Sequence, residues 1–150
     1  MKLDKLFSGL KRIDNGDYVL EGDLICDDTL EINLDDRLVV SGKIEAKKSI
    51  VANVSLIAGW GIKAGWGIEA GCGIKAGEGI EAGCGIDAGD GIEAGTFLHS
   101  EKRIFAGISV YYTSCDCNKN IVCAELRKGE ICYGNLLIRE LKDDGSKESK

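Results

Sequence analysis

A six-residue repeat with the pattern Ile-x-Ala-Gly-x-Gly fills the middle of this chain and limits its possible folds more than any other feature. The same phase runs without an insertion from Leu38 to Ile104, in steps of six residues. An α-helix has 3.6 residues per turn and loses about 1 kcal/mol for each glycine, so it does not fit this pattern. The clearest copies begin at Ile62, Ile68, Ile74, Ile80, Ile86 and Ile92.

Each hexad is typical of a short strand followed by a tight corner. The aliphatic residue and the alanine two places later would face a core, and the charged residue between them would face water. Glycine tolerates the positive φ and the close backbone approach of such a corner. The sequence therefore predicts an all-β protein, a triangular β-helix wound from a single chain with three hexads per coil. Residues 18 apart would then stack, which places Lys63 between Glu45 and Glu81.

Two stretches of the repeat resemble a known class of proteins. The runs SGKIEAKKSIVA (residues 41–52) and GWGIKAGWGIEAGCGIKAG (residues 59–77) resemble bactofilins, which are polymer-forming bacterial β-helices. They resemble still more closely the glycine-rich hexad-repeat proteins of bacteria and their phages. The resemblance implies a β-helix but specifies its function poorly. In the left-handed helices of hexapeptide acyltransferases a small residue precedes the aliphatic one by two places. Here it follows by two, which favours a right-handed helix.

The two ends of the chain depart from the repeat. Near the N-terminus five apolar residues have helical spacing and predict a capping helix, with a membrane-surface anchor as the alternative (Leu3, Leu6, Phe7, Leu10 and Ile13). A degenerate first coil would follow, with a small insertion around Asp35 and Asp36. The predicted organisation is a capping helix, the β-helix, a C-terminal β-hairpin module and a disordered tail, over residues 1–16, 17–109, 110–140 and 141–150.

Composition narrows the possible partners and the compartment. The chain has 25 acidic and 19 basic side chains and a formal net charge of −6, which disfavours direct binding to nucleic acid. It contains no apolar run of signal-peptide length and none long enough to span a membrane. The chain has seven cysteines, and an odd number in a sequence without a recognisable signal peptide indicates reduced thiols. We therefore expect a cytoplasmic protein, in the host cytoplasm if a phage encodes it.

Few residues suggest chemistry. His99 is the only histidine and is predicted to face outward, either as a surface residue or as a general base like that of hexapeptide acyltransferases. Cys115, Cys117, Cys123 and Cys132 could hold zinc, but they lack paired C-x2-C spacing, and packed or free thiols or disulfides are alternatives. The sequence has no phosphate-binding loop, dinucleotide fingerprint or nucleophile–base pair. We expect no enzymatic activity, no cofactor and no bound metal.

The remaining candidates are interaction residues. Trp60 and Trp66 occupy the variable corner of their hexads, where they either form a contact surface or lie beneath the chain's own ends or another chain. Outward carboxylates could oppose a basic groove on a partner (Glu69, Glu81, Asp87, Asp90 and Glu93).

These residues favour a non-enzymatic, acidic β-helix that acts by protein–protein interaction. It would serve either as a scaffold or as a phage-type inhibitor of a host defence or DNA-handling complex. It would bind a protein partner or itself, and a homo-oligomer is expected. One alternative is a bactofilin-like, self-assembling cytoskeletal polymer. Another is a relic of a hexapeptide-repeat acyltransferase that uses His99.

Overall fold

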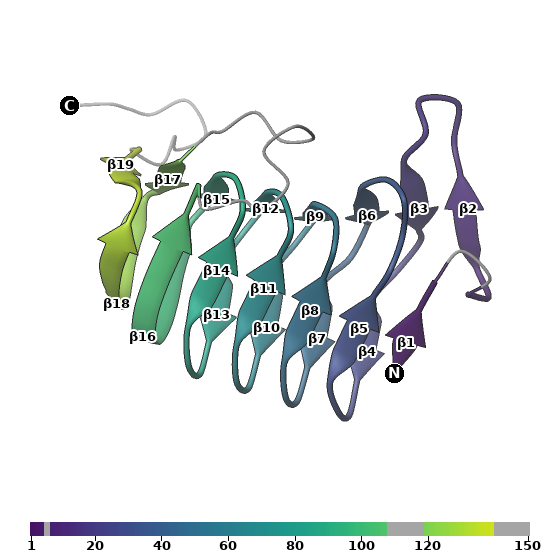
Figure 1. Cartoon of the computed structure of the whole chain (residues 1–150), viewed down its shortest axis with the longest axis horizontal. Helices are drawn as coiled ribbons and strands as arrows, with labels where there is room; N and C mark the ends of the chain where they lie inside the picture. Colours follow the sequence, from purple (N-terminus) through teal and green to yellow (C-terminus); the bar gives the residue numbers. More distant parts are fainter. Residues whose placement is uncertain (5–6, 108–118, 140–150) are drawn as a thin grey trace, which may run out of the picture.

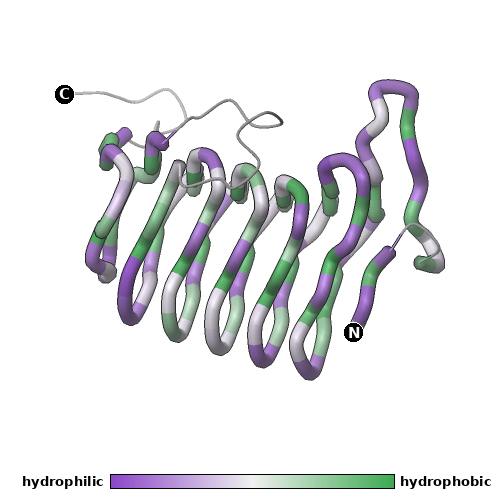
Figure 2. Tube along the Cα trace, viewed as in Figure 1, coloured by the Kyte–Doolittle hydropathy of each residue, from purple (hydrophilic) through white to green (hydrophobic). Residues whose placement is uncertain are grey.

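The chain forms a β-solenoid, as predicted (Figure 1). The solenoid has about six turns. The computed structural model describes residues 1–4, 7–107 and 119–139, and this part of the chain contains strands and no helix. It follows that no helix long and apolar enough to cross a membrane occurs among these residues. Apolar and polar residues alternate along the coils (Figure 2), because each short strand turns one side to the core.

Three faces of parallel strands run the length of the solenoid, and the long strand β16 (Phe97–Ala106) joins two of them into one hydrogen-bonded sheet. Face A contains β3 (Tyr18–Leu20), β6 (Leu38–Val40), β9 (Leu56–Ala58), β12 (Ile74–Ala76), β15 (Ile92–Ala94), β17 (Asn120–Cys123) and β19 (Asn135–Ile138). Face B contains β4 (Leu24–Cys26), β7 (Ile44–Ala46), β10 (Ile62–Ala64), β13 (Ile80–Ala82) and the first parts of β16 (Phe97–Ala106) and β18 (Glu125–Tyr133). Face C contains β1 (Lys2–Leu3), β5 (Leu30–Ile32), β8 (Ile50–Ala52), β11 (Ile68–Ala70), β14 (Ile86–Ala88) and the later parts of β16 and β18.

The predicted register of 18 residues is confirmed through the regular coils. Ile62 pairs with Ile44 on one side and with Ile80 on the other, and the alanines two places later pair in the same way. Lys63 therefore lies between Glu45 and Glu81, as expected. The isoleucine and alanine rungs are buried and form one continuous core.

The first coil contains the expected small insertion. Tyr18 pairs with Leu38, so the repeat between these two coils is longer than the regular one. The extra residues lie in the corner after β5, where Leu34 turns inward and is buried. The Tyr18 hydroxyl donates a hydrogen bond of 2.7 Å to the Asp35 carboxylate, and this contact holds the longer corner against face A.

The prediction of an N-terminal capping helix is wrong. Leu3 lies in β1, which pairs with β5, and Leu10 lies in β2 (Leu10–Arg12), which pairs antiparallel with β3. Asn15 and Gly16 lie in the turn of this hairpin, where Gly16 has a φ of 98°. The reason is that strands satisfy the open backbone groups of the first coil, which a helix could not do.

The predicted C-terminal β-hairpin is also wrong for the described residues 119–139. β17 and β18 do not pair with each other: β17 continues face A beside β15, and β18 runs parallel to β16. The last strand, β19, pairs parallel with β17. These strands are a further coil that follows a break in the repeat. Residues 110–118 of that predicted module and the predicted tail, 141–150, lie outside the described residues.

Candidate interaction face

Two exposed tryptophans flank one strand of face B. Trp60 lies in the corner before β10 and Trp66 in the corner after it, and 62% and 55% of their surfaces are exposed. They are the most exposed aromatic residues in the described part of the chain. The described residues of the two chain ends therefore leave both indoles accessible, which favours the contact-surface interpretation of these corners.

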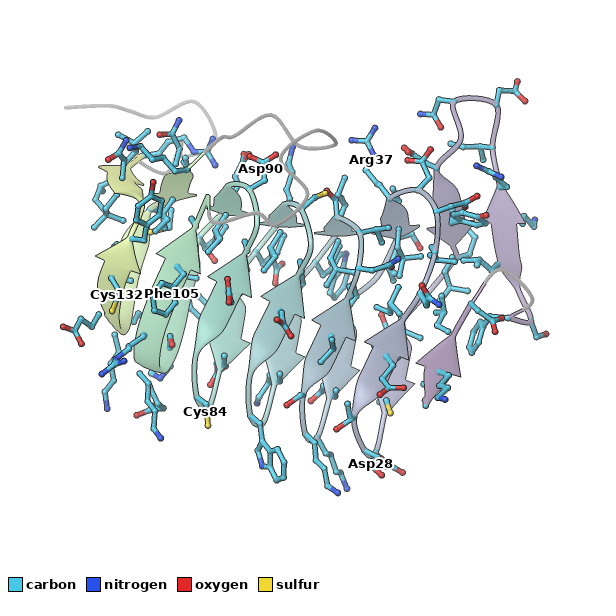
Figure 3. All side chains as sticks on the ribbon, in the orientation of Figure 1. Asp28, Arg37, Cys84, Asp90, Phe105 and Cys132 are labelled. Atoms are coloured by element: carbon cyan, nitrogen blue, oxygen red, sulfur yellow. The ribbon has the colours of Figure 1, made fainter. Side chains whose placement is uncertain are left out.

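Trp66 is held from both neighbouring coils. Its backbone N–H donates to the Lys48 carbonyl, and its own carbonyl accepts from the Cys84 N–H. The Lys48 ammonium lies 5.7 Å from the centroid of the indole ring and 2.9 Å from the Asp28 carboxylate. This ion pair lowers the pKa of Asp28, through the hydrogen bond from Lys48 first. Asp28 and Cys84 mark this corner along the lower edge of Figure 3.

A shallow groove lies beside Trp60 at the other side of face B. Trp60 and Phe97 line it together with Gly61, Gly79 and residues of β7, β10 and β13. A side chain at Gly79 would overlap the Phe97 ring, so glycine at this position leaves the space that the ring occupies. The Arg127 guanidinium lies over the same ring, 3.8 Å from its centroid. This contact extends the aromatic edge toward the C-terminal end of the solenoid.

The outward residues of face B between the two corners carry alternating charges. Glu45, Lys63 and Glu81 alternate in charge on successive strands, and His99 follows them on β16. Opposite charges on neighbouring strands attract weakly, so the column remains available to a partner.

His99 lies on face B as predicted, and it takes part in a small cluster of charges. Its Nε2 is 2.7 Å from a carboxylate oxygen of Glu101, and the Lys128 ammonium is 2.6 Å from the other oxygen. The hydrogen bonds from Lys128 and then from His99 lower the pKa of Glu101. These three polar side chains lie toward the C-terminal end of face B, on β16 and β18.

The five predicted acidic residues do not share one surface. Glu81 lies on face B, whereas Glu69 and Asp87 are neighbours on face C. Asp90 lies at the corner between faces C and A, along the upper edge of Figure 3. Glu93 faces outward from face A and pairs with Arg139 at 3.3 Å. The five side chains therefore do not form a single acidic row that could oppose a basic groove.

Asp87 and Glu69 form a like-charged pair that we expect to be slightly destabilising. Asp87 is exposed, but partial desolvation of its carboxylate, and then the Glu69 charge, raise its pKa. A raised pKa means that the folded state loses stability as the pH rises through that value. We predict that Asp87→Asn raises the free energy of unfolding by about 0.3 kcal/mol at neutral pH, a small gain because the site is solvated.

Urea titrations at several pH values would test this prediction. The gain should disappear below the ordinary pKa of aspartate, where the carboxyl group is neutral in both the folded and the unfolded state. A gain that does not depend on pH, or a loss at neutral pH, would contradict the assignment. Lys63→Gln on face B is the matched control and should slightly lower the stability, because it removes attraction to Glu45 and Glu81.

The cysteines predicted as possible zinc ligands lie only partly within the described residues. Cys115 and Cys117 are outside them. Cys123 is buried in the core, where burial raises the pKa of its thiol, and Cys132 is exposed on β18. No group of three or more metal-ligating side chains occurs among the described residues.

Sequence reasoning missed Phe97 and Arg127 as parts of the face. The sequence contained a signal for Phe97. In the regular hexads a glycine, such as Gly61 or Gly79, precedes the isoleucine, and Phe97 takes the place of that glycine. Arg127 had no such signal, since the coil to which it belongs follows a break in the repeat.

Comparison with known proteins finds no matching family model, no similar curated protein and no similar solved structure. The candidate face is therefore interpreted from the geometry of this chain alone.

Proposed function

We propose that this protein acts without catalysis, by binding another protein through face B, with Trp60 and Trp66 as anchors. The observation that supports this proposal is the pair of exposed indoles at the two ends of one rigid strand. Each indole can bury about 150–250 Å² against a partner, and tryptophan is strongly enriched among residues that dominate binding energy.

The rigidity of the solenoid strengthens the proposal. The backbone of each corner is hydrogen-bonded to the coils on either side, so binding need not order the loop that carries the tryptophan. Preordered anchors lose less entropy on association. The alternating charges of Glu45, Lys63 and Glu81 would then select a partner whose surface charges alternate in the opposite sense.

The experiment begins with a partner captured from an extract of the native host by the unmodified protein. The variants Trp60→Ala and Trp66→Ala should each weaken binding of the purified partner by roughly thirtyfold in calorimetric titration, which corresponds to about 2 kcal/mol. Both variants should keep the wild-type melting temperature, because the indoles lie outside the core.

Leu137→Ala is the matched control, because Leu137 is an exposed apolar residue on face A. It should leave the affinity for the partner unchanged. Wild-type affinity in both tryptophan variants would contradict the proposal, and so would an equal loss in the control.

The proposed binding fits either a cytoplasmic scaffold or a phage-type inhibitor of a host defence or DNA-handling complex. The net charge of −6 favours a partner with a basic surface over direct contact with nucleic acid. Light scattering separates the two roles, since filaments support a bactofilin-like scaffold and a small discrete particle supports an inhibitor.

A catalytic role is the second candidate, and the contact between His99 and Glu101 favours it. A carboxylate 2.7 Å from the imidazole can orient a general base. A relic of acyltransferase activity would turn over an acyl donor, and His99→Ala would abolish that turnover while His99→Gln would keep the fold. No turnover by the unmodified protein would leave protein binding as the function.

A further inference from the structure

The C-terminal end of the solenoid leaves part of its core uncovered. Leu136 and Ile138 of β19 lie in register with Ile121 and Cys123, which are buried. The two residues therefore occupy inward-facing rungs, yet 39% and 58% of their surfaces are exposed. The next coil, which would cover them in the middle of the solenoid, is not present among the described residues.

The same end carries an unpaired strand edge. β19 is hydrogen-bonded on the side that faces β17. There the Asn135 N–H donates to the Lys119 carbonyl and the Arg139 N–H donates to the Cys123 carbonyl. Backbone groups alternate in direction along a strand, so those of Leu136 and Ile138 point to the free edge. Within the described residues no strand pairs with that edge. Such an edge beside exposed aliphatic residues favours pairing with another strand.

The opposite end of the solenoid also has edge strands, but its core is covered, because Leu3, Leu20 and Leu24 are all buried. β1 pairs with the edge of face C, and β2 pairs antiparallel with the edge of face A. The N-terminal ammonium group also donates to the Thr29 carbonyl at 2.7 Å. A copy stacked head to tail would meet these covering strands on two of the three faces. The open end therefore has a better partner in the identical open end of a second copy.

Charge does not oppose contact between two C-terminal ends. The charged residues in and next to the last strands nearly cancel, although the whole chain has a net charge of −6 (Glu125, Arg127, Lys128, Glu130 and Arg139). Two copies would therefore repel each other only weakly at this end. The sequence of residues 140–150 has a single apolar residue, Leu141.

We propose that two copies associate through their C-terminal ends about a two-fold axis. The β19 edge and the uncovered rungs of Leu136 and Ile138 form the contact, so the two cores become continuous. A two-fold axis perpendicular both to the solenoid and to β19 reverses the strand direction and keeps the inward residues of the two copies on the same side, so strands meet antiparallel across the interface. Because a two-fold contact uses the same end of both copies, the assembly closes as a dimer and does not extend into a filament.

The test measures the mass of the full-length protein by light scattering and sedimentation across a range of concentrations. Twice the chain mass of 16.0 kDa is expected, together with a particle about twice as long as the monomer in small-angle X-ray scattering. The double variant Leu136→Lys/Ile138→Lys should weaken association by roughly a hundredfold and retain the β-rich circular dichroism spectrum. The milder double variant Leu136→Ser/Ile138→Ser should also weaken association, but by less.

Ile25→Lys is the matched control, because Ile25 is 52% exposed on β4 at the opposite end. It should remain a dimer. A monomer at every concentration, a filament, or a dimer that is lost in the Ile25 or Trp60 variants would overturn the proposal. The proposed role of face B is tested separately, because the Leu136→Lys/Ile138→Lys variant should still bind the captured protein.

Discussion

Ile80→Ala is expected to lower the free energy of unfolding by about 3 kcal/mol, measured by urea denaturation followed by circular dichroism. Ile80 is fully buried, and its strand pairs with β10 and β16. Hydrogen-bonded strands on both sides keep the coils at their normal separation, so the coils cannot close over the space that the missing atoms leave. The variant should therefore show nearly the full cost of a cavity.

Ile25→Ala removes the same atoms from an outward-facing position and is the matched control. Because 52% of Ile25 is already exposed, the loss should be below about 1 kcal/mol. Equal losses at the two sites would mean that the Ile80 rung does not form a packed core, and the register of the solenoid would then be wrong.

Gly65→Ala is expected to destabilise the protein by about 2–3 kcal/mol. A Cβ atom at Gly65 would overlap the carbonyl oxygen of Lys47 and lie 3.0 Å from the carbonyl carbon. These are backbone atoms of the coil below, so no side chain can rotate away to relieve the overlap. The positive φ that was expected at the corners does not occur here, and close approach between coils is the reason for this glycine.

Gly67→Ala provides the control on the other side of Trp66. Its added Cβ would meet only the Gly85 carbonyl oxygen, at 3.4 Å, which is close to an ordinary contact. Both substitutions restrict the unfolded chain equally, so the difference between their melting temperatures reports the folded corner. We expect Gly67→Ala to change stability by less than about 1 kcal/mol, and a similar loss in both variants would contradict the contact geometry.

The repeat was sufficient to predict most of the solenoid. An aliphatic residue followed by a charge and an alanine indicated which side of each strand is buried, and constant spacing indicated the partners of Ile62. The same reasoning failed at both ends. The apolar residues near the N-terminus fit a helical spacing as well as two short strands, and only the open edges of the first coil decide between them. After Ala106 the break in spacing hides the phase, so the later strands looked like a hairpin.

The hexads alone establish the strand positions, the buried rungs and the vertical neighbours, because these depend on a period that local chemistry repeats. Tertiary contacts place the side chains that the period does not relate. They bring Phe97 and Arg127 to the same face as Trp60, and they distribute the predicted carboxylates over three faces. They also show that the last coil ends with Leu136 and Ile138 uncovered, because whether a rung is covered depends on the strands stacked against it and not on its own sequence.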